Sequence, residues 1–399
     1  MKVLGIITEY NPMHNGHIYH IQKSKEITNC DYVVLVMSGS FTQTGNISTL
    51  DKFTKAAIAT QYGVDLVIEL PTIYATSSSE YFATGAISLL NELGIVDCIC
   101  FGSECSDIQI LNSISTKLIQ NENSIWEDIK LQGKNDTFAK TRSNVLSKYL
   151  NEDEIKEIAK PNNILGIEYL KALKKLNSNI TPYLIQRSSS DYNDSTVSQN
   201  ELNFTSATSI RNAIKNNDIE SIRKYIPTLI YDKLITSNIL LNNDIYNILK
   251  YKIISMTNSQ ISDIHEVTEG IENRLIKCIS IAKSYDELVD IMKSKRYIEN
   301  KIKRVLINVL LQIDKENFKN IALLKSNYAH ILAMSSNGST LLSNISRLSK
   351  MPVFTSINDD IISTLDNSIK YMINLDIYSS NIHSLLTNTS LNKDFTNKL

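Results

Sequence analysis

Two hydrophobic patterns take turns along the first hundred residues. Short apolar runs rich in β-branched residues are typical of buried strands, and they occupy residues 2–8, 31–37, 64–70 and 95–101. Apolar positions with helical spacing lie between them and predict helices over residues 16–27, 50–62 and 79–93. Strands that alternate with helices of this length predict a parallel sheet with right-handed crossovers. The predicted fold class is therefore α/β, with a Rossmann-like parallel sheet.

The pattern changes twice further along the chain. Residues 106–160 are polar and helix-prone, which predicts a helical insertion. Alternation then resumes with a helix, a strand and a helix, expected at residues 163–176, 181–186 and 205–215. Beyond Pro227 there is no convincing strand pattern, so we expect mainly helices up to the end.

Chain length and the uneven distribution of charge suggest two domains. The chain has 399 residues, of which 42% are apolar, so it is too long for one small core and too apolar for disorder. Of its 41 Lys/Arg and 42 Asp/Glu, residues 1–110 hold five and eleven, which makes the front acidic and the rear mildly basic. We therefore predict an α/β domain over residues 1–220 and a mainly helical domain over residues 221–399.

Several classes of protein and site are disfavoured. No apolar run approaches the roughly 18 residues of a membrane span, and the apolar start is too short for a signal peptide. Five cysteines form an odd, sparse set, unlike a disulfide framework. We expect a cytoplasmic protein without membrane contact. A zinc site at Cys98, Cys100 and Cys105 lacks an obvious fourth ligand, so we favour buried thiols and expect no bound metal there.

The sharpest chemical feature is the tetrad His14-Asn15-Gly16-His17, between the first strand and the first helix. A helix start offers unpaired amides and a positive dipole, which attract phosphate, and imidazoles one turn apart can donate to the same anion. Two other interpretations compete. The spacing of His14, His17 and His20 also suits metal ligands, and isolated histidines commonly lie at the surface. We favour phosphate binding.

A second anion site is predicted where a late helix begins. Residues 206–211 read SATSIR, so hydroxyls and free amides precede an arginine one turn into the helix. Thr208 and Arg211 would be its ligands. Taken alone, the segment is more typical of a Ser/Thr N-cap followed by a solvated arginine, but two such sites on the same sheet favour an anion site.

The rear half contains a local excess of cations. Residues 272–304 hold nine Lys/Arg and five Asp/Glu. Such helices could follow an RNA backbone, with Lys295, Arg296 and Arg304 as contacts and Tyr297 beside Arg296 to stack on a base. The alternative is a solvated face with internal ion pairs.

These motifs resemble those of the bacterial tRNA(Met) cytidine acetate ligase family, within the HIGH-motif nucleotidyltransferase superfamily. The similarity is nearly continuous over residues 1–215 and patchier to about 345. Lys295-Arg296-Tyr297 with Arg304 is similar to the family too. The segments that carry it are residues 5–17 (GIITEYNPMHNGH), 36–39 (VMSG), 65–71 (DLVIELP), 101–104 (FGSE), 160–166 (KPNNILG) and 188–192 (SSSDY).

The resemblance implies a ligase that uses ATP to activate acetate as acetyl-adenylate. The acetyl group would pass to N4 of the wobble cytidine of elongator tRNA(Met), and Mg²⁺ would accompany ATP. His14 and His17 would hold the α-phosphate region, and Thr208 and Arg211 the departing pyrophosphate. No DNA partner is expected. By the family pattern the ATP site comprises Ile7, Thr8, Glu9, Tyr10, Asn11, Pro12, Met13, His14, Asn15, Gly16, His17, Ile18, Tyr19, His20, Gly102, Asn162, Asn163, Arg187 and Ser188.

The chain departs from the family pattern in one region. Gln43-Thr44-Gly45 stands where the family usually has Gln-Arg-Gly, and a usual arginine is replaced within residues 52–55 (KFTK). A phosphate or RNA contact there is in doubt, and Lys52 or Lys55 would have to substitute for it.

Two other functions remain open from the residues alone. One is a small-molecule adenylyl- or cytidylyltransferase that makes a coenzyme precursor. The other is a degenerate nucleotide-binding module that only tethers RNA.

Overall fold

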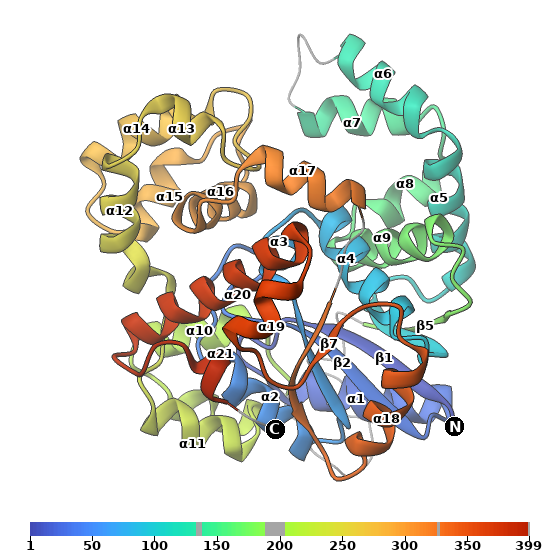
Figure 1. The fold of residues 1–399 in the computed structure, drawn as a ribbon. Coiled ribbons are helices and arrows are strands. Elements are labelled where there is room, and N and C mark those ends of the chain that lie inside the picture. Colours follow the sequence, from blue (N-terminus) through green and yellow to red (C-terminus); the bar gives the residue numbers. More distant parts are fainter. Residues whose placement is uncertain (133–137, 188–203, 325–327, 398–399) are drawn as a thin grey trace.

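A seven-stranded sheet crosses the computed structural model, which describes residues 1–132, 138–187, 204–324 and 328–397 (Figure 1). Its strand order is β5-β4-β1-β2-β3-β6-β7. The first five strands of the chain run parallel to one another, and β6 is antiparallel to β3. The strands are β1 (Val3–Thr8), β2 (Tyr32–Ser38), β3 (Leu66–Leu70), β4 (Cys98–Ser103), β5 (Thr181–Gln186), β6 (Ala329–Met334) and β7 (Val353–Phe354).

The helices that connect these parallel strands lie where the periodicity predicts them. Their ends differ from the expected ends by only a few residues, so the α/β class and the parallel sheet are confirmed. The helices of this part are α1 (Asn15–Thr28), α2 (Lys52–Gln61), α3 (Thr72–Ala75), α4 (Ser79–Glu92), α9 (Pro161–Lys175) and α10 (Ala207–Lys215), followed by η1 (Glu220–Tyr225) and α11 (Thr228–Thr236).

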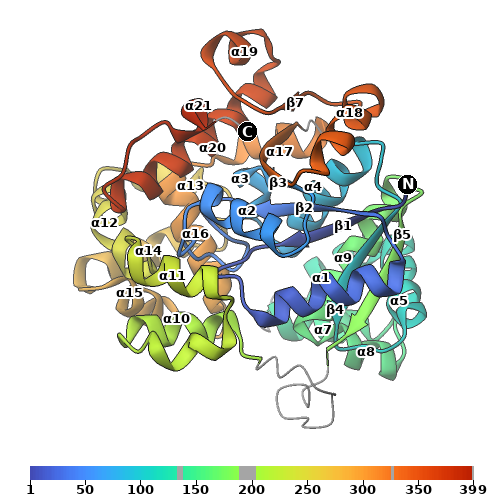
Figure 2. The ribbon, with the colours of Figure 1, turned by 90° about the horizontal axis from the view of Figure 1, so that it is seen from below.

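Helices bury both faces of the sheet, because successive strand residues point to opposite sides. Leu4 and Ile6 of β1 belong to a core shared with α1, α2, α10 and α11, which cover one face (Figure 2). Val3 of β1 and Val34 of β2 belong to a second core, shared with α4, α9 and the rear helices.

The predicted helical insertion is also confirmed. Four helices follow β4 before α9 returns to the sheet, and α6 and α7 extend from the side of the molecule (Figure 1). They are α5 (Ile108–Gln120), α6 (Glu122–Gln132), α7 (Phe138–Leu146) and α8 (Glu152–Ile158).

The expectation that the rear half lacks strands is wrong. Residues 329–334 form β6, which is buried beside β3, and β7 pairs with β6. A short apolar run inside a helical region cannot be told from a buried helix by periodicity, which is why β6 was not predicted. The sheet therefore extends past residue 220, and the division into two domains stays a prediction.

Helices make up most of the remaining rear half, as predicted. No helix of the described residues has both the length and the apolar character needed to cross a bilayer. The rear elements are η2 (Asn242–Ile245), α12 (Tyr246–Ile254), α13 (Asn258–Ser262), α14 (Ile271–Ile281), α15 (Tyr285–Met292), α16 (Glu299–Leu311), α17 (Lys315–Leu324), α18 (Gly338–Leu348), α19 (Asp359–Thr364), α20 (Asn367–Leu386) and α21 (Lys393–Thr396).

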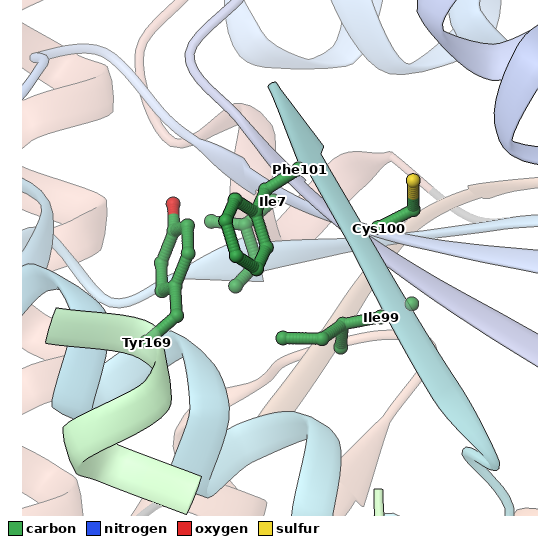
Figure 3. Close-up of a pocket in the computed structure, with 6 residues that line it drawn as sticks. Ile7, Ile99, Cys100, Phe101 and Tyr169 are labelled. Carbon is green, nitrogen blue, oxygen red and sulfur yellow. The ribbon is translucent and has the colours of Figure 1, made fainter. Parts of the chain in front are cut away.

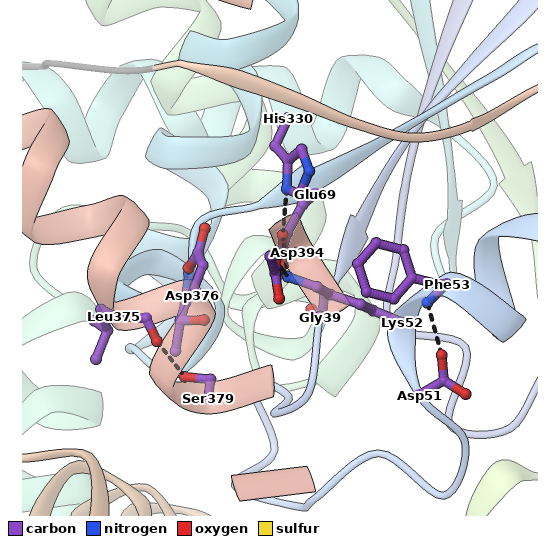
Figure 4. Close-up of polar contacts among 12 residues, drawn as sticks. Gly39, Asp51, Lys52, Phe53, Glu69, His330, Leu375, Asp376, Ser379 and Asp394 are labelled. Atoms are coloured by element: carbon purple, nitrogen blue, oxygen red, sulfur yellow. Dashed lines mark hydrogen bonds and ion pairs between the residues drawn. The ribbon is translucent and has the colours of Figure 1, made fainter. Parts of the chain in front are cut away.

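A buried ammonium group joins the two ends of the chain (Figure 4). Nζ of Lys52, at the start of α2, lies 2.7 Å from the Glu69 carboxylate of β3 and 2.5 Å from Oδ1 of Asp394 in α21. All three side chains are at most 1% exposed. Burial alone would raise the pKa of Glu69, but the Lys52 charge lowers it to about 2. Both carboxylates are needed because a buried, unpaired ammonium is costly.

The same cluster includes a histidine and has the spacing of a metal site. Nδ1 of His330, in β6, lies 3.1 Å from Oε2 of Glu69. Glu69, His330 and Asp394 bring their ligand atoms within 4.8 Å of one another. Lys52 already supplies the positive charge among them, so the cluster is an internal ion-pair network.

Replacing Lys52 by Met tests this network. Two buried carboxylates would lose their cation, so we expect the free energy of unfolding to fall by about 3–5 kcal/mol. Urea denaturation measures the change. Lys23→Met is the matched control, because Lys23 pairs with Glu26 at the surface and its loss should change stability little. Equal effects of the two substitutions would show that the buried network is not stabilising.

Candidate active site

The loop between β1 and α1 is held in an unusual backbone conformation. Tyr10 has a φ of 45°, in the left-handed region that aromatic residues rarely adopt. The next residue of the loop, Asn11, is held by its own side chain, whose Nδ2 donates to the Ile47 carbonyl at 2.9 Å. Its Oδ1 accepts from both the backbone N–H and the hydroxyl of Thr49, at 2.8 and 2.9 Å. The backbone conformation of the loop is therefore held by the surrounding hydrogen bonds, because the intrinsic preference of Tyr10 would not favour it.

The side chain of Lys55 also holds this loop in place. Its buried Nζ lies 3.1 Å from the Glu9 carbonyl, 2.9 Å from the Ser38 and Gly39 carbonyls, and 3.0 Å from the Ser48 hydroxyl. Burial lowers the pKa of Lys55 to about 7. Lys52 and Lys55 both point inward, so the hypothesis that either supplies the missing phosphate or RNA contact is wrong.

His14 and His17 stack against each other at the start of α1. Their ring centroids lie 3.7 Å apart. The backbone N–H of His14 donates to Nδ1 of His17 at 3.1 Å. That nitrogen must therefore be unprotonated, which leaves Nε2 of His17 as the N–H donor. This hydrogen bond caps the helix and sets the tautomer at once.

The three histidines of this motif are not ordinary surface residues. Burial and the nearby Arg187 charge lower the pKa of His14 and of His20 to about 4. Burial lowers the pKa of His17 well below its usual value. Among the described residues, Nδ1 of His14 and Nε2 of His20 are buried without a hydrogen-bond partner. Buried polar atoms normally have hydrogen-bond partners, so these two nitrogens are unsatisfied in the protein without a ligand.

Arg211 brings the second predicted anion site to the first. Its Nη1 donates to the Asn11 carbonyl at 2.6 Å, and its Nη2 donates to the Thr208 hydroxyl at 3.1 Å. Ser206 caps α10 by accepting from the Ser209 N–H at 3.0 Å, so the N-cap interpretation holds for that residue. Arg211 is not a solvated side chain, however, because it spans the space between α10 and the histidine loop.

Gly102 and Arg187 lie side by side where β4 and β5 end. A Cβ at Gly102 would lie 2.8 Å from Cδ of Arg187, so a larger residue at this position would displace the exposed Arg187 side chain. Nη1 of Arg187 donates to Oδ1 of Asn162 at 2.9 Å. Ser188 lies outside the described residues. The predicted residues Gly102, Asn162 and Arg187 are therefore brought together.

Asn163 has a supporting place instead. It is fully buried, and its Oδ1 accepts from the Ser103 hydroxyl at 2.6 Å and from the Glu104 and Cys105 N–H groups. Its Nδ2 donates to Glu157. Every polar atom of its side chain is thus used inside the protein, so Asn163 positions the loop after β4.

Two carboxylates support this part of the site. Glu9 is among the predicted ATP-site residues, whereas Glu104 is not. Glu104 accepts from the Asn163 N–H at 3.1 Å and from Nδ2 of Asn162 at 2.6 Å, which closes the start of α9. Glu9 accepts from the Gln43 N–H at 2.6 Å, and burial raises its pKa. Glu104 comes two residues after Gly102, at the carboxyl end of β4, and contacts the start of α9. Ligands of open α/β sheets bind at the carboxyl ends of the strands, so the position of Glu104 in the sequence could have marked it as a site residue.

The cavity drawn in Figure 3 lies on one face of the sheet, between β1, β4 and α9. Its volume is only about 10 Å³, and Phe101 and Tyr169 form much of its wall. It is a packing void rather than a ligand site. Cys98, Cys100 and Cys105 are buried and form no disulfide, and burial raises the pKa of Cys100 to about 11.

The predicted RNA contacts divide into two groups. Lys295 and Arg296 are exposed in the turn before α16. Arg304 is instead 12% exposed and forms a close pair with Glu266, at 2.8 Å. Tyr297 is buried and donates its hydroxyl to the Glu269 carbonyl at 2.5 Å. Internal pairing therefore removes Arg304 and Tyr297 from the candidate RNA surface, and a stacking role for Tyr297 is wrong.

Comparison with known proteins agrees with this geometry. The model of the family described as HIGH Nucleotidyl Transferase matches residues 1–398. A Clostridium perfringens protein named tRNA(Met) cytidine acetate ligase is 40% identical, covering 99% of this chain and 98% of its own. A Clostridium novyi protein of the same name is 39% identical with the same coverage.

A solved structure extends the similarity to three dimensions. The crystal structure of Thermotoga maritima TmcAL bound with alpha-thio ATP has a TM-score of 0.91 and 28% sequence identity. The alignment covers 100% of this chain and 99% of that one. The same protein without ligand gives a TM-score of 0.92. With the histidine loop, the α10 arginine and these relatives in agreement, the chain belongs to the HIGH nucleotidyl transferase family and, within it, to the tRNA(Met) cytidine acetate ligases.

Proposed function

We propose that this chain uses ATP to join acetate to N4 of the wobble cytidine of elongator tRNA(Met), in the cytoplasm. The observation that carries the proposal is the meeting of His14 and His17 at the start of α1 with Arg211 of α10. The names of the relatives support the substrates, and the ATP analogue in the Thermotoga structure supports the nucleotide.

The start of α1 fits a nucleoside triphosphate. Its free amides and positive dipole favour phosphate, and neutral His17 adds an N–H from Nε2. A Cβ at Gly16 would lie 3.0 Å from the His14 ring, so glycine at this position avoids crowding that ring. The unpartnered Nδ1 of His14 offers a further polar contact. Thr208 and Arg211 would hold the β- and γ-phosphates.

The first step needs no protein nucleophile. A carboxylate oxygen of acetate attacks the α-phosphorus, the bond to the β-phosphate oxygen breaks, and pyrophosphate leaves. Charge that develops on the α-phosphoryl oxygens is stabilised by the imidazole N–H of His17 and the amides of α1. Arg211 neutralises the leaving pyrophosphate. Mg²⁺ would be held mainly by phosphate oxygens, because Glu9 is already engaged with Gln43.

In the second step the cytidine N4 attacks the acetyl carbon of acetyl-adenylate. The bond to the AMP oxygen breaks, AMP leaves, and the amine loses a proton. Positioning supplies much of the acceleration in such a transfer. We place tRNA binding in the helical rear half, residues 221–399, where Lys295 and Arg296 are exposed.

Exchange of labelled pyrophosphate into ATP tests the first step without RNA. We expect exchange that depends on acetate, because adenylate formation is reversible. Exchange that requires another acid or a phosphate ester would indicate a small-molecule nucleotidyltransferase. A well-folded protein that shows no exchange would contradict the proposal and favour a module that only binds RNA.

His17→Ala tests the phosphate site. Losing one preorganised donor should reduce acetate-dependent exchange about 10²–10³-fold. The helix also loses a cap, at a cost of about 0.5–2 kcal/mol, so the variant should still fold. Circular dichroism checks the fold. Near-normal exchange by the folded variant would remove His17 from the mechanism.

Replacing Lys295 and Arg296 together by Ala tests the RNA surface. Binding of tRNA should weaken, and the slope of log affinity against log salt should flatten by a little under one unit for each lost phosphate contact. Lys233→Ala with Lys319→Ala, at two other exposed lysines, is the charge-matched control. Identical slopes for wild type and the first variant would place the RNA elsewhere, while pyrophosphate exchange should stay unchanged throughout.

A further inference from the structure

A second cavity lies away from the histidine loop, among the start of α2, the end of α11, the end of α20 and α21. Its volume is about 300 Å³, within the range of small-molecule sites. Polar groups of Asp51, Ser237, His383, Thr387, Thr389 and Lys393 line it. A cavity with so much polar lining needs a polar occupant.

His383 decides what kind of occupant fits. Its Nε2 lies 3.0 Å from the Ser48 carbonyl, which can only accept, so this nitrogen carries a proton. Burial lowers the pKa of His383 to about 4, so the ring is neutral near pH 7 and Nδ1 is an acceptor. His383 is 2% exposed, and Nδ1 has no hydrogen-bond partner among the described residues. An occupant that donates to Nδ1 would satisfy this acceptor, whereas a simple anion would not.

Lys393 favours a negatively charged group on the occupant of the cavity. Across the described part of the chain, no ion pair joins its ammonium to Asp51, although both residues line the cavity. Its backbone is anchored, because the next residue, Asp394, pairs with Lys52 in the core (Figure 4). A cation in the lining of a cavity favours a carboxylate or another anionic acceptor.

Asp51 adds negative charge near His383. Burial would raise the pKa of Asp51, but hydrogen bonds from Thr54 lower it, so the carboxylate is ionised. The cavity lining thus offers a carboxylate, an imidazole lone pair and an ammonium. The Lys393 charge also lowers the pKa of Asp51, so the two groups lie near each other without forming an ion pair in the described part of the chain. A ligand that carries both charges would complement them.

We propose that this cavity is a binding site for a small zwitterion, an α-amino acid, with its ammonium group toward Asp51 and His383 and its carboxylate toward Lys393. Thr387 and Thr389 also line the cavity and provide further polar groups. The site is separate from the proposed ATP site, and segment 48–51 lies between them. Thr49 contacts Asn11 on one side of that segment, and Leu50 and Asp51 line the cavity on the other.

Isothermal titration of the full chain with each of the twenty common L-amino acids tests the site. At least one should bind with a Kd of about 10 μM to 1 mM, the range expected for a small ligand with a few charged contacts. The same compound without its amine, and the same compound without its carboxylate, should each bind at least about tenfold more weakly. Binding of no amino acid, or equal binding of either truncated analogue, would overturn the proposal.

Variants connect the binding to this cavity. Lys393→Met should weaken the amino acid about tenfold or more, and Lys319→Met, at an exposed lysine of α17, should leave it unchanged. His383→Gln keeps a donor for Ser48 and should retain folding while weakening the ligand. Unchanged affinity in folded Lys393→Met would overturn the assignment. So would binding of inorganic phosphate or cytidine in place of the amino acid, because either would mean an anion or nucleoside site.

Discussion

An ammonium group without water must have negative charge around it, and the Lys52 side chain has none within its own helix. It finds Glu69 on the central strand β3 and Asp394 near the end of the chain. Satisfying this one cation fixes the start of α2 against the sheet and fixes α21 against α2. The histidine loop and the 300 Å³ cavity both depend on that junction.

The histidine loop depends on the position of α2 because Lys55, one turn after Lys52, contacts that loop. Lys55 follows Lys52 by three residues and binds the Glu9 carbonyl together with the carbonyls that end β2. The loop therefore holds a left-handed Tyr10 and delivers the two stacked imidazoles to the start of α1. Because the tautomer of His17 is set by the His14 N–H, the donor needed for phosphate is already oriented before a nucleotide binds.

Sequence reasoning succeeded where the signal is local and failed where long-range pairing decides. The first five strands, the helices between them and the placement of His14 and Arg211 follow from periodicity and from helix-start chemistry. Strand β6 could not be recognised, because a six-residue apolar run acquires its identity only by pairing with β3. Arg304, Lys52 and Lys55 were read as candidate anion contacts, but their partners Glu266, Asp394 and Glu9 are distant in sequence. Nothing in a single chain's pattern shows which cation is paired internally.

A site that couples ATP and acetate to one nucleotide of tRNA leaves its product on that nucleotide. Elongator tRNA(Met) lacking the modification is incubated with the protein, ATP and acetate, then digested and examined by mass spectrometry. We expect N4-acetylcytidine at the wobble position, and only when both ATP and acetate are present. Absence of the modified nucleoside with all components present, or its formation without ATP, would show that the chain does not carry out this ATP-dependent acetylation.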